Sequence, residues 1–208
     1  MHACLVHSPP DFHRMNFVVL SSSRGTTFQA VLDRIADGTL TAHCLGLVTD
    51  RLDRGCVEKA RNAGVHIAVV ERQPKEPRET YDMRLDAAIR GLGDVDVIAT
   101  LGWMYLLTPW FVGQWRHRIL NVHPALLPKY PGAHSIEDAL KDGAQESGMT
   151  IHLIDEGVDT GPVLLQKSCP VEHDDTPDTL KERIQALEKE WYPQALQMIE
   201  DGALKLPR

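Results

Sequence analysis

The sequence has few of the features that mark secreted, membrane-embedded or metal-binding proteins. Its four cysteines are scattered, with no short Cys–Cys or Cys–His spacing of the kind that binds zinc. We therefore expect reduced thiols, a cytoplasmic location and no metal. No apolar run reaches the length of a membrane-spanning helix, so we expect no membrane partner.

Basic residues are also in deficit. The chain has 22 Lys and Arg against 29 Asp and Glu, a formal net charge of −7. A nucleic-acid-binding surface normally carries a basic stripe, so we expect no nucleic acid partner. The negative net charge does not exclude a small anionic ligand, because backbone amides and single arginines can hold a phosphate on an acidic protein. We expect small-molecule substrates, bound by a monomer or a homodimer.

Strand and helix patterns alternate regularly through the first half of the chain. Apolar runs that predict strands occur at 16–21, 43–49, 65–70 and 95–102. Segments with helical spacing separate them, at 26–38, 56–64 and 80–92. This alternation predicts an α/β fold with a doubly wound, mostly parallel sheet.

The pattern changes in the second half. Further strands are expected at 118–123, 149–154 and 163–167, with one helix near 134–142 and a long C-terminal helix. Residues 1–14 are expected to be a disordered N-terminal extension. Residues 15–208 are expected to form one domain, in which halves 15–115 and 116–208 share a sheet and enclose a cleft.

Three loops carry candidate sites. The first is "SSSRGTT" (21–27), between the first expected strand and helix. Backbone N–H groups at a helix start, with a glycine that permits close approach, can bind an anion. A plain strand-to-helix turn would have a similar composition, so both interpretations stay open. The loop is neither a Walker A sequence nor a GxGxxG fingerprint.

The second candidate is "NVHPALLPKYPGAH" (121–134). Alternate residues of a strand share a face, so Asn121 and His123 can address one point at the strand's C-terminal end. Open α/β sheets bind ligands at that edge. The alternative is an asparagine that caps the loop and a histidine that packs in the core.

The third candidate is "IDEGVDTGP" (154–162), which follows another expected strand. Asp159 could face His123 across the cleft, where a carboxylate would orient an imidazole and favour its charged form. The alternative is a solvated acidic turn.

These three stretches, in this order, resemble those of the glycinamide ribonucleotide formyltransferases, the folate-dependent enzymes of purine synthesis. "NVHPALLPKYPG" and "DEGVDTGPVLLQ" are typical of the wider formyltransferase family. "FQAVLD", "LGWMYLLTP" and "DDTPDTLKERIQALEKEWYP" favour the glycinamide ribonucleotide branch. The resemblance implies a Rossmann-like formyltransferase fold. It also implies 10-formyltetrahydrofolate as co-substrate, no metal, and formyl transfer to the amine of glycinamide ribonucleotide.

The resemblance further implies roles for individual residues. Asn121 would donate to the formyl oxygen, and His123 as imidazolium would stabilise the oxyanion. Asp159 would keep His123 charged and help to move a proton. The acceptor's phosphate and ribose would bind Gly25, Thr26, Thr27, Gln185 and Glu188. The folate would bind Arg78, Met104, Tyr105, Leu107 and Asp155.

The sequence departs from the family at two places. The family's phosphate loop usually reads Ser-Gly-x-Gly-Ser-Asn, whereas Ser23, Thr26 and Thr27 stand here for its first Gly, second Ser and Asn. Tyr105 occupies a position where arginine is common. Other functions therefore stay open: formyl transfer to another amine such as an amino sugar nucleotide, hydrolysis of formyltetrahydrofolate, or folate or nucleotide binding without catalysis.

Overall fold

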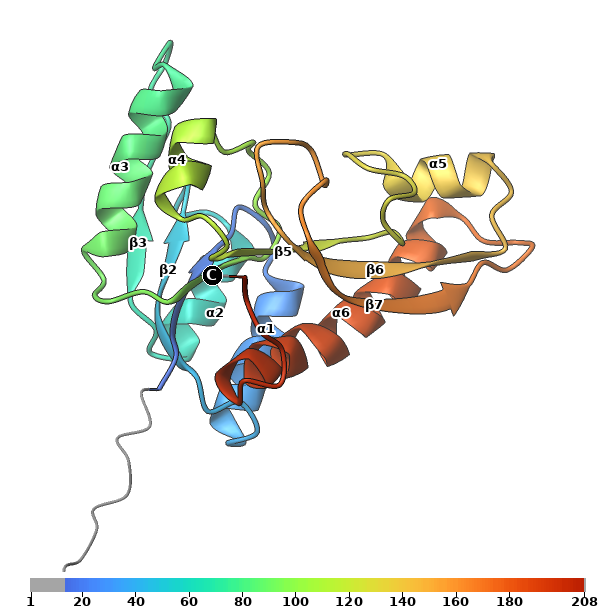
Figure 1. Ribbon diagram of the computed structural model, residues 1–208, viewed down its shortest axis with the longest axis horizontal. Helices are drawn as coiled ribbons and strands as arrows, with labels where there is room; N and C mark the ends of the chain where they lie inside the picture. The colour runs from blue at the N-terminus through green and yellow to red at the C-terminus, as the bar shows by residue number, and fades with distance from the viewer. Residues whose placement is uncertain (1–13, 208) are drawn as a thin grey trace, which may run out of the picture.

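The computed structural model describes residues 14–207, so the expected extension lies outside the described residues except for its last residue. Seven strands are present: β1 (Asn16–Leu20), β2 (His43–Thr49), β3 (Ile67–Val69), β4 (Val97–Thr100), β5 (Ile119–His123), β6 (Glu146–Leu153) and β7 (Val163–Pro170). They form one sheet in the order β3-β2-β1-β4-β5-β6-β7 (Figure 1). The first five strands run parallel, and β6 and β7 join antiparallel. The expected doubly wound, mostly parallel sheet is confirmed.

Six helices accompany the sheet: α1 (Thr26–Ala36), α2 (Gly55–Asn62), α3 (Arg78–Arg90), α4 (Pro109–Gln114), α5 (Ser135–Lys141) and α6 (Pro177–Glu200). Two apolar clusters show which face each helix covers. The first cluster joins α1, α2 and α6 to one side of β1, β4 and β5, and the second joins α3 and α4 to the other side. Strands covered on both faces need continuous apolar sequence, which is why β1 and β4 read as unbroken apolar runs.

β1 shows this division residue by residue. Phe17 and Val19 belong to the first cluster, whereas Val18 and Leu20 belong to the second, and all four are fully buried. The strand order reverses between β1 and β4, because the chain builds β2 and β3 on one side and β4 and β5 on the other. Ligands of doubly wound sheets bind beyond the carboxyl ends of the strands at such a reversal.

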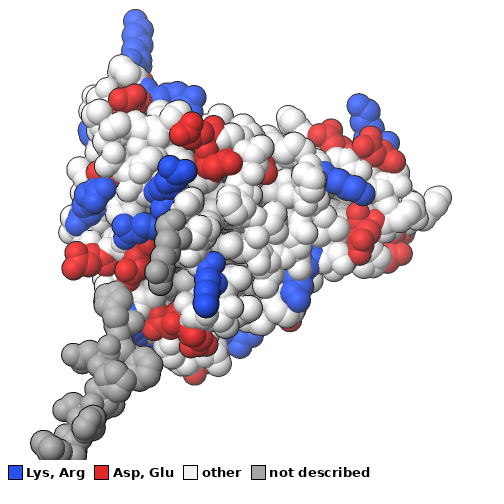
Figure 2. Space-filling view, viewed as in Figure 1, with Lys and Arg blue, Asp and Glu red and all other residues white. Residues whose placement is uncertain are grey.

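The second half of the chain forms an arm beside this core. β6 and β7 extend away from the parallel strands, with α5 and the first part of α6 alongside them (Figure 1). All strands share one sheet, and the expected division at residue 115 stays a prediction. Within residues 14–207 no helix is both long and apolar enough to cross a membrane. On the face drawn in Figure 2, basic and acidic side chains are interspersed.

Three details differ from the sequence-based expectations. The short helix α4 was not expected, although Thr108 accepts a hydrogen bond from Phe111 N–H at its start and Pro109 stands in its first turn. β6 begins at Glu146, three residues before the expected start at 149. β7 runs to Pro170, three residues beyond the expected end at 167.

Candidate active site

Asn121 lies in β5 between two polar neighbours in register, Thr100 on β4 and His152 on β6. The Thr100 hydroxyl donates to Asn121 Oδ1 at 2.7 Å. Asn121 Nδ2 donates to His152 Nε2 at 3.0 Å. A carboxamide NH₂ group has two protons, so this arrangement leaves one N–H for a ligand oxygen.

His123, two residues further along β5, is only 4% exposed. Its Nε2 donates to the carbonyl of Tyr130 at 2.8 Å, and its Nδ1 lies 3.3 Å from Asp159 Oδ2. Burial lowers the pKa of His123, and the Tyr130 carbonyl and the Asp159 charge oppose this fall without cancelling it. The ring donates from Nε2 and faces a carboxylate through Nδ1, an arrangement that suits its charged form, so the expected charging of His123 by Asp159 stays a prediction.

Asp159 lies at the centre of a small polar cluster. Its Oδ2 accepts the Gly132 N–H at 2.8 Å, and its Oδ1 lies 3.5 Å from His152 Nε2. Burial acts to raise the pKa of Asp159, but the nearby His152 and His123 rings and the Gly132 N–H together hold it below its usual value. The structure thus brings Asn121, His123 and Asp159 together around His152, with an ionised carboxylate between two imidazoles.

The loop that carries Asp159 has a backbone that depends on glycine and on internal hydrogen bonds. A Cβ atom at Gly161 would lie 1.8 Å from the Leu153 carbonyl oxygen, so only glycine allows the loop to return so closely to β6. Asp155 Oδ1 accepts hydrogen bonds from the Gly157 N–H at 3.0 Å and the Thr160 hydroxyl at 2.7 Å. Asp159 itself has a φ of +55°, an uncommon conformation for a non-glycine residue that often marks functional sites.

The residues expected to hold the acceptor lie on the first loop and on α6. A Cβ atom at Gly25, whose φ is +72°, would lie 2.9 Å from Cys56 Cα. The Thr27 hydroxyl donates to Glu188 Oε2 at 3.1 Å, so the loop and helix meet directly. Burial raises the pKa of Glu188 to about 7, against the opposing effect of this hydrogen bond. Gln185 and Thr26 are half-buried.

The residues expected to hold the folate surround the segment after β4. Met104 is 73% exposed, and Tyr105 and Leu107 are half-buried. Arg78 donates to the Leu106 carbonyl at 2.9 Å. Arg78 thus contacts the segment that carries the exposed Met104, and such a segment suits a ligand with an apolar ring and an anionic tail.

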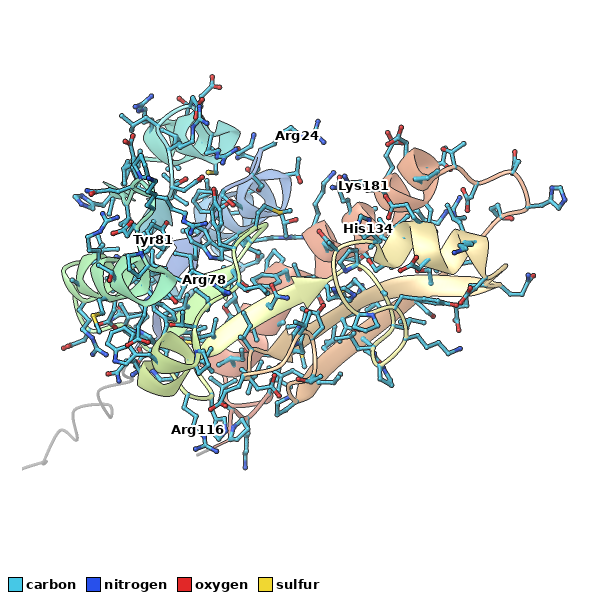
Figure 3. All side chains as sticks on the ribbon, turned by 90° about the horizontal axis from the view of Figure 1, so that it is seen from above. Arg24, Arg78, Tyr81, Arg116, His134 and Lys181 are labelled. Atoms are coloured by element: carbon cyan, nitrogen blue, oxygen red, sulfur yellow. The ribbon has the colours of Figure 1, made fainter. Side chains whose placement is uncertain are left out.

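Tyr105 is held by charged neighbours. Its hydroxyl donates to Asp50 Oδ2 at 2.9 Å, and Arg54 binds both oxygens of the same carboxylate at 3.0 and 2.6 Å. The guanidinium of Arg72 lies 5.1 Å from the Tyr105 ring centroid and 5.5 Å from that of Tyr81. The family commonly has an arginine at position 105. This chain has Tyr105 there, with the guanidinium of Arg72 over its ring. Seen from above, Arg78 and Tyr81 lie on the α3 side, and His134 and Lys181 on the α5 and α6 side (Figure 3).

Two histidines near the motifs have different surroundings. His152 contacts both Asn121 and Asp159, whereas His134 is exposed at the start of α5. The sequence interpretation missed Thr100, although its place at the end of the strand beside β5 was a usable signal. It also missed the Tyr130 carbonyl and the Gly132 amide, because a backbone group has no sequence signature.

Replacing Thr100 with valine tests whether the hydroxyl orients the Asn121 amide. Valine keeps the shape of threonine but leaves Asn121 Oδ1 without this donor. We expect kcat to fall roughly fivefold, as one net hydrogen bond of about 1 kcal/mol allows. Steady-state kinetics would measure this. An unchanged kcat would mean that His152 alone orients the amide.

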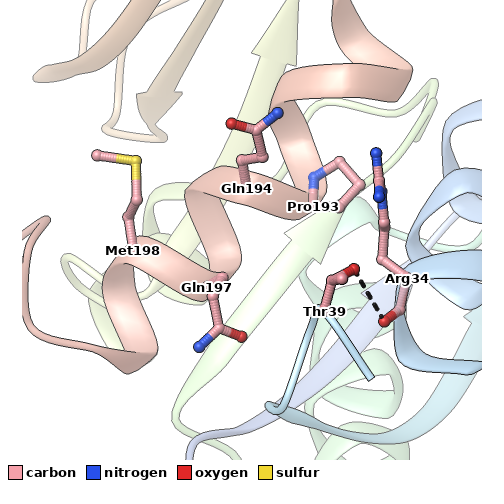
Figure 4. A pocket seen from close by; sticks show the side chains of 6 residues that line it. All are labelled: Arg34, Thr39, Pro193, Gln194, Gln197 and Met198. Carbon is pink, nitrogen blue, oxygen red and sulfur yellow. Dashed lines mark hydrogen bonds between the residues drawn. The ribbon is translucent and has the colours of Figure 1, made fainter. Parts of the chain in front are cut away.

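A hollow between α1 and α6 is separate from this cluster. A cavity of about 280 Å³ lies between Arg34 and Thr39, at the C-terminal end of α1, and Pro193, Gln194, Gln197 and Met198 of α6 (Figure 4). It is thus at the opposite end of α1 from Gly25. Among residues 14–207, no group of three or more His, Cys, Asp or Glu side chains is arranged to hold a metal ion.

The fold and the cluster define an α/β protein with acid–base groups at the reversal edge of its sheet, where a transferase would bind two substrates. The chain belongs to the formyl transferase family, whose model matches residues 15–196. It is 35% identical to the phosphoribosylglycinamide formyltransferase of Escherichia coli K12, over 92% of this chain and 90% of that protein.

Two further similarities agree with this family. The chain is 37% identical to the trifunctional purine biosynthetic protein adenosine-3 of Drosophila melanogaster over 91% of its own length, but it spans only 14% of that protein. The crystal structure of glycinamide ribonucleotide transformylase 1 from Symbiobacterium toebii matches with a TM-score of 0.89 at 34% identity, covering 94% of this chain and 92% of that one.

Proposed function

We propose that this protein transfers the formyl group of 10-formyltetrahydrofolate to the amine of glycinamide ribonucleotide in de novo purine biosynthesis. The observation that carries the proposal is the cluster of Asn121, His123 and Asp159 at the end of β5. Similarity to the Escherichia coli enzyme over nearly the whole of both chains supports the choice of acceptor. A cytoplasmic location and a monomeric or homodimeric state stay predictions.

The chemistry asks for a stabilised oxyanion. The acceptor's amine attacks the formyl carbon, and the carbonyl electron pair moves onto oxygen as the tetrahedral intermediate forms. Asn121 donates its remaining N–H to this oxygen. The His123 Nε2–H shifts its hydrogen bond from the Tyr130 carbonyl to the same oxygen, and as imidazolium the ring stabilises the developing negative charge. Preorganised donors of this kind contribute about 2.7–4 kcal/mol each.

The reaction then asks for proton transfer. The attacking nitrogen becomes positively charged and must lose a proton before the product is stable. Asp159 is ionised and lies beside both histidines, so it can accept this proton through a water molecule. The proton is returned to N10 as the carbon–N10 bond breaks, and tetrahydrofolate leaves with the bonding electron pair.

The two substrates occupy opposite sides of this centre. The acceptor's phosphate binds at Gly25, Thr26 and Thr27, and its ribose at Gln185 and Glu188. The pterin of the folate lies against Met104, Tyr105, Leu107 and Asp155. Arg78 binds a carboxylate of the glutamate tail, and Arg72 supplies beside Tyr105 the positive charge that this position lacks.

An Arg72→Gln substitution tests the folate side. We expect the KM for 10-formyltetrahydrofolate to rise roughly fivefold with little change in kcat, because one exposed charge contact to the tail is lost. A formyl-folate analogue without the glutamate tail should show no difference between the two proteins. Arg51→Gln is the matched control, since Arg51 is an exposed arginine paired with Asp53. Equal effects with both co-substrates would contradict a tail-binding role.

The acceptor assay tests the function as a whole. Incubation with 10-formyltetrahydrofolate and glycinamide ribonucleotide should yield tetrahydrofolate and formylated product. The substituted first loop favours one competing function, transfer to another amine, so amino sugar nucleotides should be tried in parallel. Turnover only with such an amine would reject the acceptor and keep the chemistry. Formate release without any acceptor would indicate a hydrolase, and absence of every turnover a binding protein.

A further inference from the structure

The first loop carries a side chain where the family's phosphate loop has its first glycine, and the hydroxyl of that side chain is held inside the loop. Ser23 Oγ accepts the Gly25 N–H at 3.1 Å. It donates to the Leu101 carbonyl at 3.3 Å and lies 3.1 Å from Ser21 Oγ. The hydroxyl therefore has both a donor and an acceptor partner within the protein.

The Gly25 N–H is a group that the proposed function needs. Gly25 is the N-cap of α1, and the amides at this point are those the acceptor's phosphate would meet. With glycine at position 23, this N–H would have no side-chain partner and would be free for the ligand. In this protein Ser23 Oγ already accepts a hydrogen bond from the Gly25 N–H.

The surroundings decide whether Ser23 would help or hinder a phosphate. Its single hydroxyl proton is directed to Leu101 O or Ser21 Oγ, so the oxygen presents lone pairs to Gly25. Close packing confines the side chain, because a Cβ atom at Gly102 would lie 2.5 Å from Ser23 Oγ. Lone pairs beside an incoming phosphate oxygen repel it, and turning the proton toward the ligand would break an existing hydrogen bond.

We propose that Ser23 is a specificity-determining residue that weakens phosphate binding by competing for the Gly25 N–H. The inference rests on the proposed function, which places the acceptor's phosphate at this loop. Ser23 would affect the binding of the acceptor, because the phosphate must displace the Ser23 oxygen before it can accept the Gly25 N–H. The folate contacts and the cluster at the end of β5 are not altered by it.

Ser23→Ala tests the proposal, since it removes the hydroxyl and keeps Cβ. We expect the KM for glycinamide ribonucleotide to fall roughly two- to tenfold, the value of one net hydrogen bond, with kcat and the folate KM unchanged. The Kd for inorganic phosphate, measured by calorimetry, should fall by the same factor. Ser21→Ala is the matched control, because Ser21 Oγ contacts Ser23 but not Gly25. It should leave both constants near those of the original protein.

A higher or unchanged acceptor KM in Ser23→Ala would overturn the proposal, as would absence of phosphate binding in both proteins. If Ser23→Ala folds poorly, Ser23→Gly restores the residue usual in the family and should show the same fall. The proposed function fails separately, when the original protein does not formylate glycinamide ribonucleotide. The calorimetric comparison with inorganic phosphate still decides the role of Ser23 in that case.

Discussion

Replacing His123 with alanine is expected to lower kcat by about 10²–10³, with little change in the KM of either substrate. The ring touches the reacting oxygen only as negative charge develops there, so its loss acts on the transition state and not on binding. Steady-state kinetics with both substrates would separate the two parameters. Asn121→Ala should give a fall of similar size, and the double variant should lose less than the product of both, because the two donors act on one atom.

His134→Ala is the matched control for this experiment. His134 belongs to the same motif but is exposed at the start of α5, away from the hydrogen bonds of Asp159. It should retain full activity. Thermal unfolding of each variant would show whether a fall in kcat reflects lost chemistry or lost structure. If correctly folded His123→Ala kept more than about a third of the original kcat, the oxyanion role would be wrong.

Replacing Glu188 with glutamine is expected to stabilise the protein at pH 8 by about 3 kcal/mol. Burial raises the pKa of Glu188 from the ordinary 4.5 to about 7. Between these pH values the folded state holds a proton that the unfolded state has released. Stability therefore falls as pH rises through this window, and above pH 7 the whole cost of burying the charge is present. Glutamine carries no charge and still accepts from Thr27.

Urea unfolding at pH 5 and pH 8 would measure this effect. The gain at pH 5 should be under about 1 kcal/mol, since Glu188 is then protonated in the folded protein. Glu190→Gln, on the exposed side of the same helix, should change little at either pH. The stabilised Glu188→Gln protein should also have a higher acceptor KM, because a ribose hydroxyl loses a charged acceptor. Equal stabilisation at both pH values would rule out ionisation of Glu188 as the cause.

The sequence predicts the sheet well because its strands obey simple rules. β1 and β4 are covered on both faces and therefore read as apolar runs, and the helices between them keep a 3.6-residue period. Helix α4 was not predicted, because its six residues are too few to show a helical period. The start of β6 was not predicted, because residues 146–148 lack a strand pattern. They belong to the strand because they pair with β7.

The candidate site was predictable only in part. Strand alternation placed Asn121 and His123 on one face, and the acidic loop 154–162 after another expected strand offered Asp159 as a partner across the cleft. The lowering of the His123 pKa was not predictable, because it depends on how deeply the ring is buried and on a carbonyl from Tyr130. Such quantities belong to the packed molecule and leave no mark on the local sequence.

The pairing of β4, β5 and β6 has a consequence for substrate specificity. Asn121 is aligned with Thr100 on one side and His152 on the other by main-chain ladders, so a slip of a single residue would scatter all three. The contacts proposed for the acceptor come instead from a turn and a helix that this ladder does not include. Substitutions in the first loop can thus alter the proposed recipient of the one-carbon unit without moving the three aligned side chains.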